Sequence, residues 1–114
     1  MIRNRSNARL ICRSELYAES FFQRLTGMLT RKFSESLDGI VFPDCDAVHT
    51  FGMRFALDII FVDRNNNSIV SIFRNVKPWK VAAAGRRNCL AVELPAGFID
   101  DNLCKTGDIL DFTQ

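Results

Sequence analysis

Ionisable side chains interrupt an otherwise apolar stretch between residues 49 and 63. His49, Arg54, Asp58 and Asp63 lie within the sequence HTFGMRFALDIIFVD, whose other residues are mainly apolar. A strand that only fills a core does not need so many charges, because burying an unpartnered charge is costly. The stretch therefore predicts a polar pocket lined by one end of a β-sheet.

Asp58 is the most constrained of these side chains. Side chains alternate across a strand, so Asp58 shares its face with apolar neighbours if residues 57–63 form a strand. It is expected to meet Arg54, Arg24 or backbone N–H groups, or to keep its proton. Three roles stay open for it: an internal ion pair that fixes the register of the sheet, an anchor in a binding pocket, and a catalytic group.

Glu93 raises the same question inside the apolar sequence AVEL of residues 91–94. If Asp58 and Glu93 were neighbours, their repulsion would raise the pKa of one of them, which is the arrangement of paired acid and base catalysts. His49, the single histidine, is the obvious group for proton transfer near neutral pH. A hydrolase or lyase that uses the two carboxylates with His49 is therefore the alternative to a binding role.

No complete catalytic or metal-binding motif accompanies these residues. Thr50 and Ser68 lack the Gly-x-Ser-x-Gly context of an activated serine, and Cys45 lacks a cysteine-hydrolase context. The six glycines are scattered and form no phosphate-binding loop, and no acidic run resembles a calcium loop. The four cysteines lack paired two-residue spacing, so we expect buried thiols rather than zinc ligands or a redox pair. Neither a metal nor a cofactor is expected.

Two basic regions could contact an anionic partner. One begins the chain and the other surrounds the single tryptophan: Arg3, Arg5, Arg9 and Arg13 in the first, and Lys77, Trp79 and Lys80 in the second. An aromatic ring between lysines can stack on a base or sugar. A nucleic-acid partner is nevertheless not expected, because the net charge is only +2 and the motifs of known RNA-binding modules are missing. We interpret residues 1–7 as a basic N-terminal arm, free to be flexible, and the second region as an amphipathic loop.

Composition predicts one soluble domain. With 114 residues, 47% apolar residues and ten phenylalanines, the chain can bury a core as a single domain over residues 1–114. Arg13 interrupts the apolar residues after the basic start, so no secretory signal is expected. The uninterrupted apolar runs, such as residues 59–62, are far shorter than a membrane span. These features predict a cytoplasmic protein without a membrane partner.

Hydrophobic periodicity predicts one helix and six or seven short strands. Residues 18–29 place apolar side chains at helical spacing, with Gly27 near the end. Strands are predicted where branched and aromatic side chains are bounded by turns, namely at residues 8–13, 39–42, 47–51, 57–63, 68–75, 89–94 and 109–112. The Ala-rich residues 81–85 fit either a short helical turn or a loop.

This pattern predicts a mainly β fold with one or two helices, an α+β domain. Many short strands at this spacing are typical of closed or two-layered sheets. We therefore expect a barrel-like or jelly-roll-like β-sandwich, with the helix packed near one open end.

Five short pieces of sequence, in order along residues 18–112, carry a family resemblance. They are RLTGML at 24–29 with Arg31, GIVF at 39–42, Met53 and LDIIFVD at 57–63 with Ile69-Val70, ELPAG at 93–97, and Gly107-Asp108. In these pieces the chain resembles the small bacterial and archaeal proteins of the domain of unknown function 192 family. The resemblance implies a β-rich, jelly-roll-like barrel and supplies no established activity. One departure is visible: Phe51-Gly52-Met53 stands where the family usually has Phe-Trp-Met, and losing that tryptophan is expected to widen part of any pocket there.

We therefore predict a noncatalytic binding module. Its polar pocket is expected to be lined by Arg24, His49, Arg54, Asp58 and Glu93, and to hold a small polar molecule or a segment of a partner protein. Polar residues cluster in recognisable motifs, whereas no complete catalytic set does, and this difference favours binding over the hydrolase or lyase alternative.

Overall fold

A five-stranded sheet forms the central layer of the structure, a computed structural model that describes residues 1–18 and 37–113. Its strands follow the order β3 (Glu15–Tyr17), β4 (Gly39–Phe42), β9 (Cys89–Pro95), β6 (Leu57–Asp63) and β7 (Ile69–Val76). β3 and β4 are parallel, and the other neighbours are antiparallel. The connection between β3 and β4 runs through residues 19–36, outside the described ranges.

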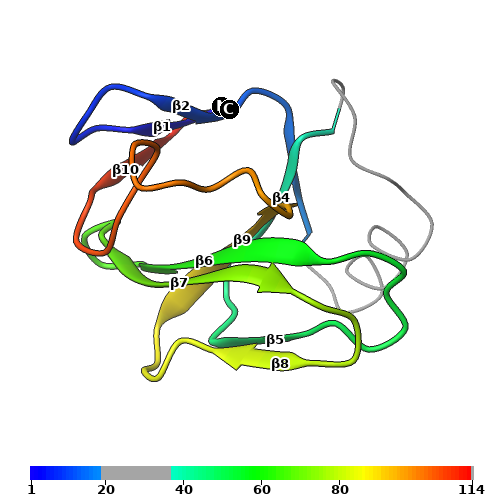
Figure 1. Cartoon of the computed structure of the whole chain (residues 1–114). Coiled ribbons are helices and arrows are strands. Elements are labelled where there is room, and N and C mark those ends of the chain that lie inside the picture. The colour runs from blue at the N-terminus through cyan, green and yellow to red at the C-terminus, as the bar shows by residue number, and fades with distance from the viewer. Residues whose placement is uncertain (19–36, 114) are drawn as a thin grey trace.

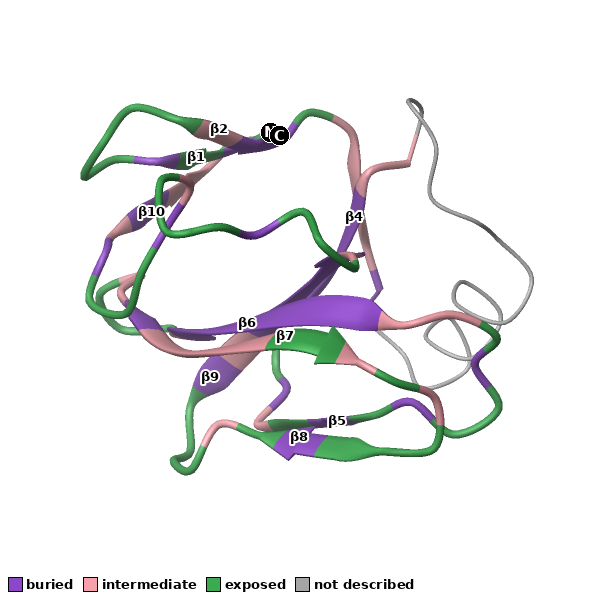
Figure 2. Cartoon of the chain, in the orientation of Figure 1, coloured by how far each residue is buried: buried purple, intermediate pink, exposed green. Residues whose placement is uncertain are grey.

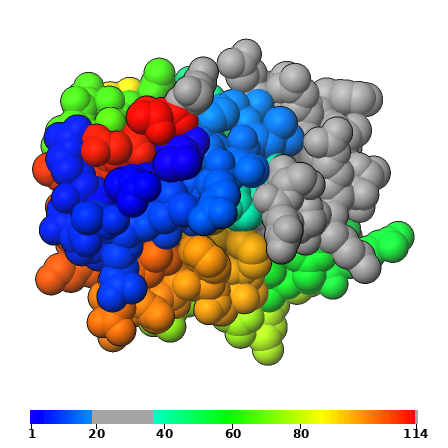
Figure 3. Space-filling view, turned by 90° about the horizontal axis from the view of Figure 1, so that it is seen from above, coloured from blue at the N-terminus to red at the C-terminus, as the bar shows by residue number. Residues whose placement is uncertain are grey.

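Two smaller sheets lie on opposite sides of the central sheet (Figure 1). The first is three-stranded, in the order β10 (Leu110–Phe112), β1 (Ile2–Asn4), β2 (Leu10–Cys12). The second is a ribbon of β5 (Ala47–His49) and β8 (Val81–Ala83). Part of the expected N-terminal arm therefore forms β1, and the first and last strands lie side by side, as Figure 3 shows from above.

Each face of the central sheet fills its own hydrophobic core. On β6, Ile60 and Val62 pack toward the three-stranded sheet, whereas Ile59 and Phe61 pack toward the ribbon. Because both faces are covered, β4, β6 and β9 are buried along most of their length (Figure 2). Burying each large apolar side chain contributes about 1.5–3 kcal/mol, so both covering layers are needed.

Most of the predicted strands are confirmed. β4 and β6 have the predicted bounds, and β2, β5, β7, β9 and β10 differ from the predicted ranges by a few residues at most. The hydrophobic pattern does not predict β1, β3 or β8. Each has only three residues, too few to show an alternating pattern.

The predicted fold class, an α+β domain with a barrel-like or jelly-roll-like sandwich, is wrong. The described residues form strands and no helix, and their sheets do not close into a barrel, since the central sheet ends at β3 and β7. Residues 81–85, expected as a helical turn or loop, contain β8. Ala82 is buried between exposed Val81 and Ala83, so the alternation of a paired strand outweighs the helix propensity of alanine.

The predicted helix over residues 18–29 lies outside the described residues, except for Ala18, which is buried directly after β3. Within the described ranges there is also no helix long and apolar enough to cross a bilayer.

Gly39 provides a test of how closely the layers pack. A Cβ at this position would overlap the sulfur of Cys12 and lie 3.2 Å from Leu94 Cδ2. We expect Gly39→Ala to lower the free energy of unfolding by about 1–3 kcal/mol, because the added methyl group overpacks the core. In a Cys12→Ala background the same change should cost less, since the sulfur is gone. Urea unfolding of the four proteins measures this coupling, and strictly additive losses would contradict the close approach.

Candidate functional site

Backbone N–H groups satisfy the carboxylate of Asp58, which is fully buried. Its Oδ1 accepts a hydrogen bond from the Asn75 N–H at 2.8 Å, and its Oδ2 accepts one from the Ile99 N–H at 2.9 Å. Asn75 lies near the end of β7, and Ile99 lies in the loop after β9. Asp58 therefore ties β6 to the edge strand and to this loop. The sequence predicted Arg54, Arg24 or backbone N–H groups as partners of Asp58. Among the described residues, its partners are backbone N–H groups.

Asp58 and Glu93 point to opposite faces of the central sheet. In the register of β6 and β9, Asp58 lies opposite Leu94 and Glu93 lies opposite Ile59. Directly opposed residues share a face, and successive residues alternate. Leu94 belongs to the core beneath the three-stranded sheet, whereas Ile59 belongs to the core beneath the ribbon. The sheet separates the two buried carboxyl groups, so they do not form an acid and base pair.

The other predicted site residues lie apart from Asp58. His49 ends β5 and is exposed, and Arg54 is exposed in the loop that follows. Arg24 lies outside the described residues. The described members of the predicted set therefore divide between the interior and the surface instead of lining one polar pocket.

The cysteine side chains are free thiols, and all four are buried. Burial, with nearby Asp108 and Asp100 as further causes, raises the pKa of the Cys104 thiol to about 11. Burial likewise raises the pKa of Cys12. Both thiols therefore stay protonated near neutral pH, which disfavours a role as nucleophiles. The described part of the chain also contains no group of three His, Cys, Asp or Glu side chains placed to hold a metal ion.

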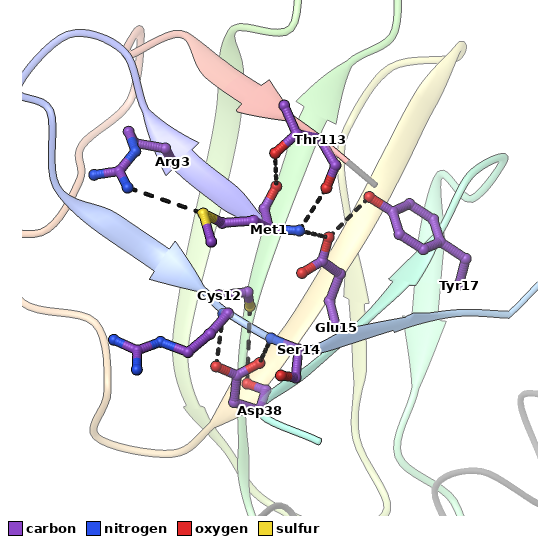
Figure 4. A network of polar contacts seen from close by, with 9 residues as sticks. Met1, Arg3, Cys12, Ser14, Glu15, Tyr17, Asp38 and Thr113 are labelled. Carbon is purple, nitrogen blue, oxygen red and sulfur yellow. Dashed lines mark hydrogen bonds and ion pairs between the residues drawn. The ribbon is translucent and has the colours of Figure 1, made fainter. Parts of the chain in front are cut away.

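A second polar cluster connects β1 to β3 (Figure 4). The Met1 amino group donates to Glu15 Oε2 at 2.6 Å, and the Tyr17 hydroxyl donates to the same oxygen at 3.0 Å. Nearby, the Asp38 carboxylate accepts the backbone N–H groups of residues 13 and 14 at 2.7 and 2.9 Å. These contacts join strands and fix a turn, so we assign this cluster to the fold.

Exposed apolar side chains gather at one end of the β5–β8 ribbon. The ring centroids of His49 and Phe51 are 5.0 Å apart, and those of Phe51 and Trp79 are 5.7 Å apart with planes at 23°. Phe51 is 46% exposed, Trp79 68% and Val81 63%. Val81 lies directly opposite His49 in the ribbon. We call His49, Phe51, Trp79 and Val81 the aromatic face.

Thr50 holds the aromatic face from the inside. It is fully buried, and its hydroxyl donates to the Lys77 carbonyl at 2.7 Å and accepts from the Lys80 N–H at 2.9 Å. Its carbonyl oxygen accepts the Trp79 N–H at 3.0 Å. These bonds fasten the turn at residues 77–80 to the end of β5. From the sequence, Thr50 was considered only as a nucleophile, although alternation after buried Val48 places it inward.

The backbone of Trp79 is in the left-handed region, with φ of 66°. This conformation is unfavourable by about 1–2 kcal/mol for a residue with a side chain, and it is a clear outlier for a bulky one. The ring is mostly exposed, so its burial contributes little stability to offset this strain. A large ring held outside the core by strained backbone is typical of a functional site.

Known proteins resemble this chain in sequence and in fold. The model of the DUF192 family, described as "Uncharacterized ACR", matches residues 3–112. A UPF0127 protein of Pyrococcus furiosus is 30% identical over 101 residues, which cover 86% of this chain and 85% of the relative. A crystal structure of a protein of unknown function from Novosphingobium aromaticivorans superposes with a TM-score of 0.76 at 23% identity, covering 97% of this chain and 81% of that one. A putative transcription regulator from Sinorhizobium meliloti gives a TM-score of 0.69 at 21% identity, with 83% and 78% coverage. At these identities the two structures show the shared fold alone.

Replacing Asp58 tests its role in holding β6, β7 and the loop together. We expect Asp58→Ala to lower the free energy of unfolding by about 3 kcal/mol, because two backbone N–H groups lose their acceptor. Chemical denaturation measures the loss. Asp101→Ala, at a fully exposed carboxylate, is the matched control and should change stability by no more than about 0.5 kcal/mol. A loss below about 1 kcal/mol for Asp58→Ala would contradict the structural role.

The second substitution tests the anchor beneath the aromatic face. Thr50→Val keeps the size of the side chain but removes the hydroxyl, so we expect a loss of about 1–3 kcal/mol of stability. The single tryptophan should also become more mobile, seen as lower fluorescence anisotropy. Thr106→Val, at an exposed position, is the control. Unchanged anisotropy in the Thr50→Val protein would show that the hydroxyl does not hold the turn.

Proposed function

The chain belongs to the DUF192 family, and we propose that it is a noncatalytic binding module that captures a segment of a partner protein on its aromatic face. The observation that supports this is the exposed stack of His49, Phe51 and Trp79, fixed from below by buried Thr50. Protein interfaces are enriched in aromatic side chains, and tryptophan is among the residues that contribute most to binding energy.

The ribbon around the stack adds an uncharged surface. Its outward side chains are Ala47, His49, Val81 and Ala83, while Val48 and Ala82 pack into the core on the inner side. A surface with an aromatic centre and small apolar neighbours favours contact with another protein, since charged residues are depleted at the centres of interfaces.

The geometry favours this surface over a pocket for a small polar molecule. Sites for small molecules are concave and have converging polar groups. Asp58 and Glu93 instead face opposite cores, and His49 and Arg54 lie at the surface. A hydrolase or lyase with paired carboxylates would need Asp58 beside Glu93, which the register of β6 and β9 does not allow. His49 and Arg54 remain in the proposal as surface residues.

Trp79→Gly separates binding from folding. Glycine adopts the left-handed backbone readily, so we expect stability to stay the same or to rise by up to about 1 kcal/mol. Binding should weaken at least tenfold, because the ring is lost. The probes are labelled peptides selected from a displayed random library on the wild-type protein, titrated against both variants.

Phe98→Ala is the matched control for this test. Phe98 is 45% exposed, close to the 46% of Phe51, but it lies in the loop after β9. We expect this variant to bind the selected peptides as the wild type does. Equal affinity of the wild type and Trp79→Gly would refute the aromatic face as the binding surface.

A further inference from the structure

We infer that the segment bound by the aromatic face is acidic, an inference that rests on the proposed function. Three cations accompany the face. Lys77 and Lys80 belong to the turn that carries Trp79, and Arg54 lies three residues after Phe51. All three side chains belong to exposed residues.

These charges have no acidic partner in ion pairs among the described residues. Four other arginines of the described ranges do have such partners, in the pairs Arg5–Asp111, Arg64–Asp44, Arg74–Asp101 and Arg86–Asp63. The positive charge of Lys77, Lys80 and Arg54 is therefore available to a partner.

The acids nearest to the ribbon in sequence lie at its other end. Asp44 and Asp46 precede β5, whereas Phe51 follows it. In the ribbon, Ala47 pairs with Ala83 and His49 pairs with Val81, so the start of β5 is distant from the turn at Trp79. Arg86 and Arg87 follow β8 at that other end, so its charges are mixed. Residues 50–56 and 76–80, which flank the rings, include three cations and no acid. Complementary charge of this kind speeds association and rejects partners of the same sign.

The apolar surroundings of the rings favour a peptide over a nucleic acid. Val81 is 63% exposed, and the neighbouring outward residues are Ala47 and Ala83. Three cations and a net charge of +2 provide few phosphate contacts, whereas strands of nucleic acid bind through many. A segment that alternates carboxylates with apolar side chains can satisfy both the lysines and the rings.

The test compares peptide selection on two proteins. On the wild type, the random displayed library should enrich peptides with net negative charge and at least one large apolar residue. Their affinity should fall at least tenfold between 0.05 and 0.5 M NaCl. The K77E/K80E variant, shown by denaturation to fold, should lose these peptides and enrich basic ones instead. Lys105→Glu, at an exposed lysine outside the ribbon, is the control and should keep the wild-type preference.

The remaining outcomes distinguish this inference from the proposal beneath it. If the wild type selects neutral or basic peptides whose binding depends on Trp79, the inference of an acidic partner is wrong, but the proposed binding module is supported. A selection without any peptide that depends on Trp79 would overturn both. Two further results would refute the acidic segment, because each identifies another occupant of the aromatic face. One is binding of a labelled single-stranded oligonucleotide that Trp79→Gly abolishes. The other is dimerisation, measured by sedimentation, that Trp79→Gly abolishes.

Discussion

The central sheet has two apolar faces, and both must be kept from water. Ile60 and Val62 on one face require the three-stranded sheet, and Ile59 and Phe61 on the other require the ribbon. The ribbon meets this requirement with its inner side chains alone, chiefly Val48 and Ala82. Its outer side is therefore not needed for the core, and this is the side that carries the aromatic face.

Much of the central sheet could be predicted from sequence, because runs of branched and aromatic residues mark strands that are covered on both faces. The role of Asp58 could not. In a sequence, a carboxylate that accepts hydrogen bonds from backbone N–H groups cannot be distinguished from one that lines a pocket. Its two partners lie 17 and 41 residues away along the chain, and they donate through backbone N–H groups, which nearly every residue carries. Burial of Asp58 was implied by its neighbours, but its partners depend on the tertiary structure.

The aromatic face was hidden from sequence analysis for a similar reason. Phe51 and Trp79 belong to separate loops, and only the pairing of β5 with β8 brings their rings together. Residues 81–85 were predicted as a helical turn or loop, so the sequence did not predict this pairing. The departure at Gly52 was expected to widen a pocket. That expectation stays a prediction. The single tryptophan of this chain, Trp79, stacks on Phe51, the residue beside Gly52.

The bonds from Thr50 to the turn at Trp79 have a consequence for the thermodynamics of association. The backbone on both sides of the ring is already fixed, and the ring lies against Phe51 before any partner arrives. In the proposed complex the protein would then lose little conformational entropy, and more of the contact energy would be expressed as affinity. The cost of the strain at Trp79 thus falls on folding, and the proposed partner would meet a preorganised surface.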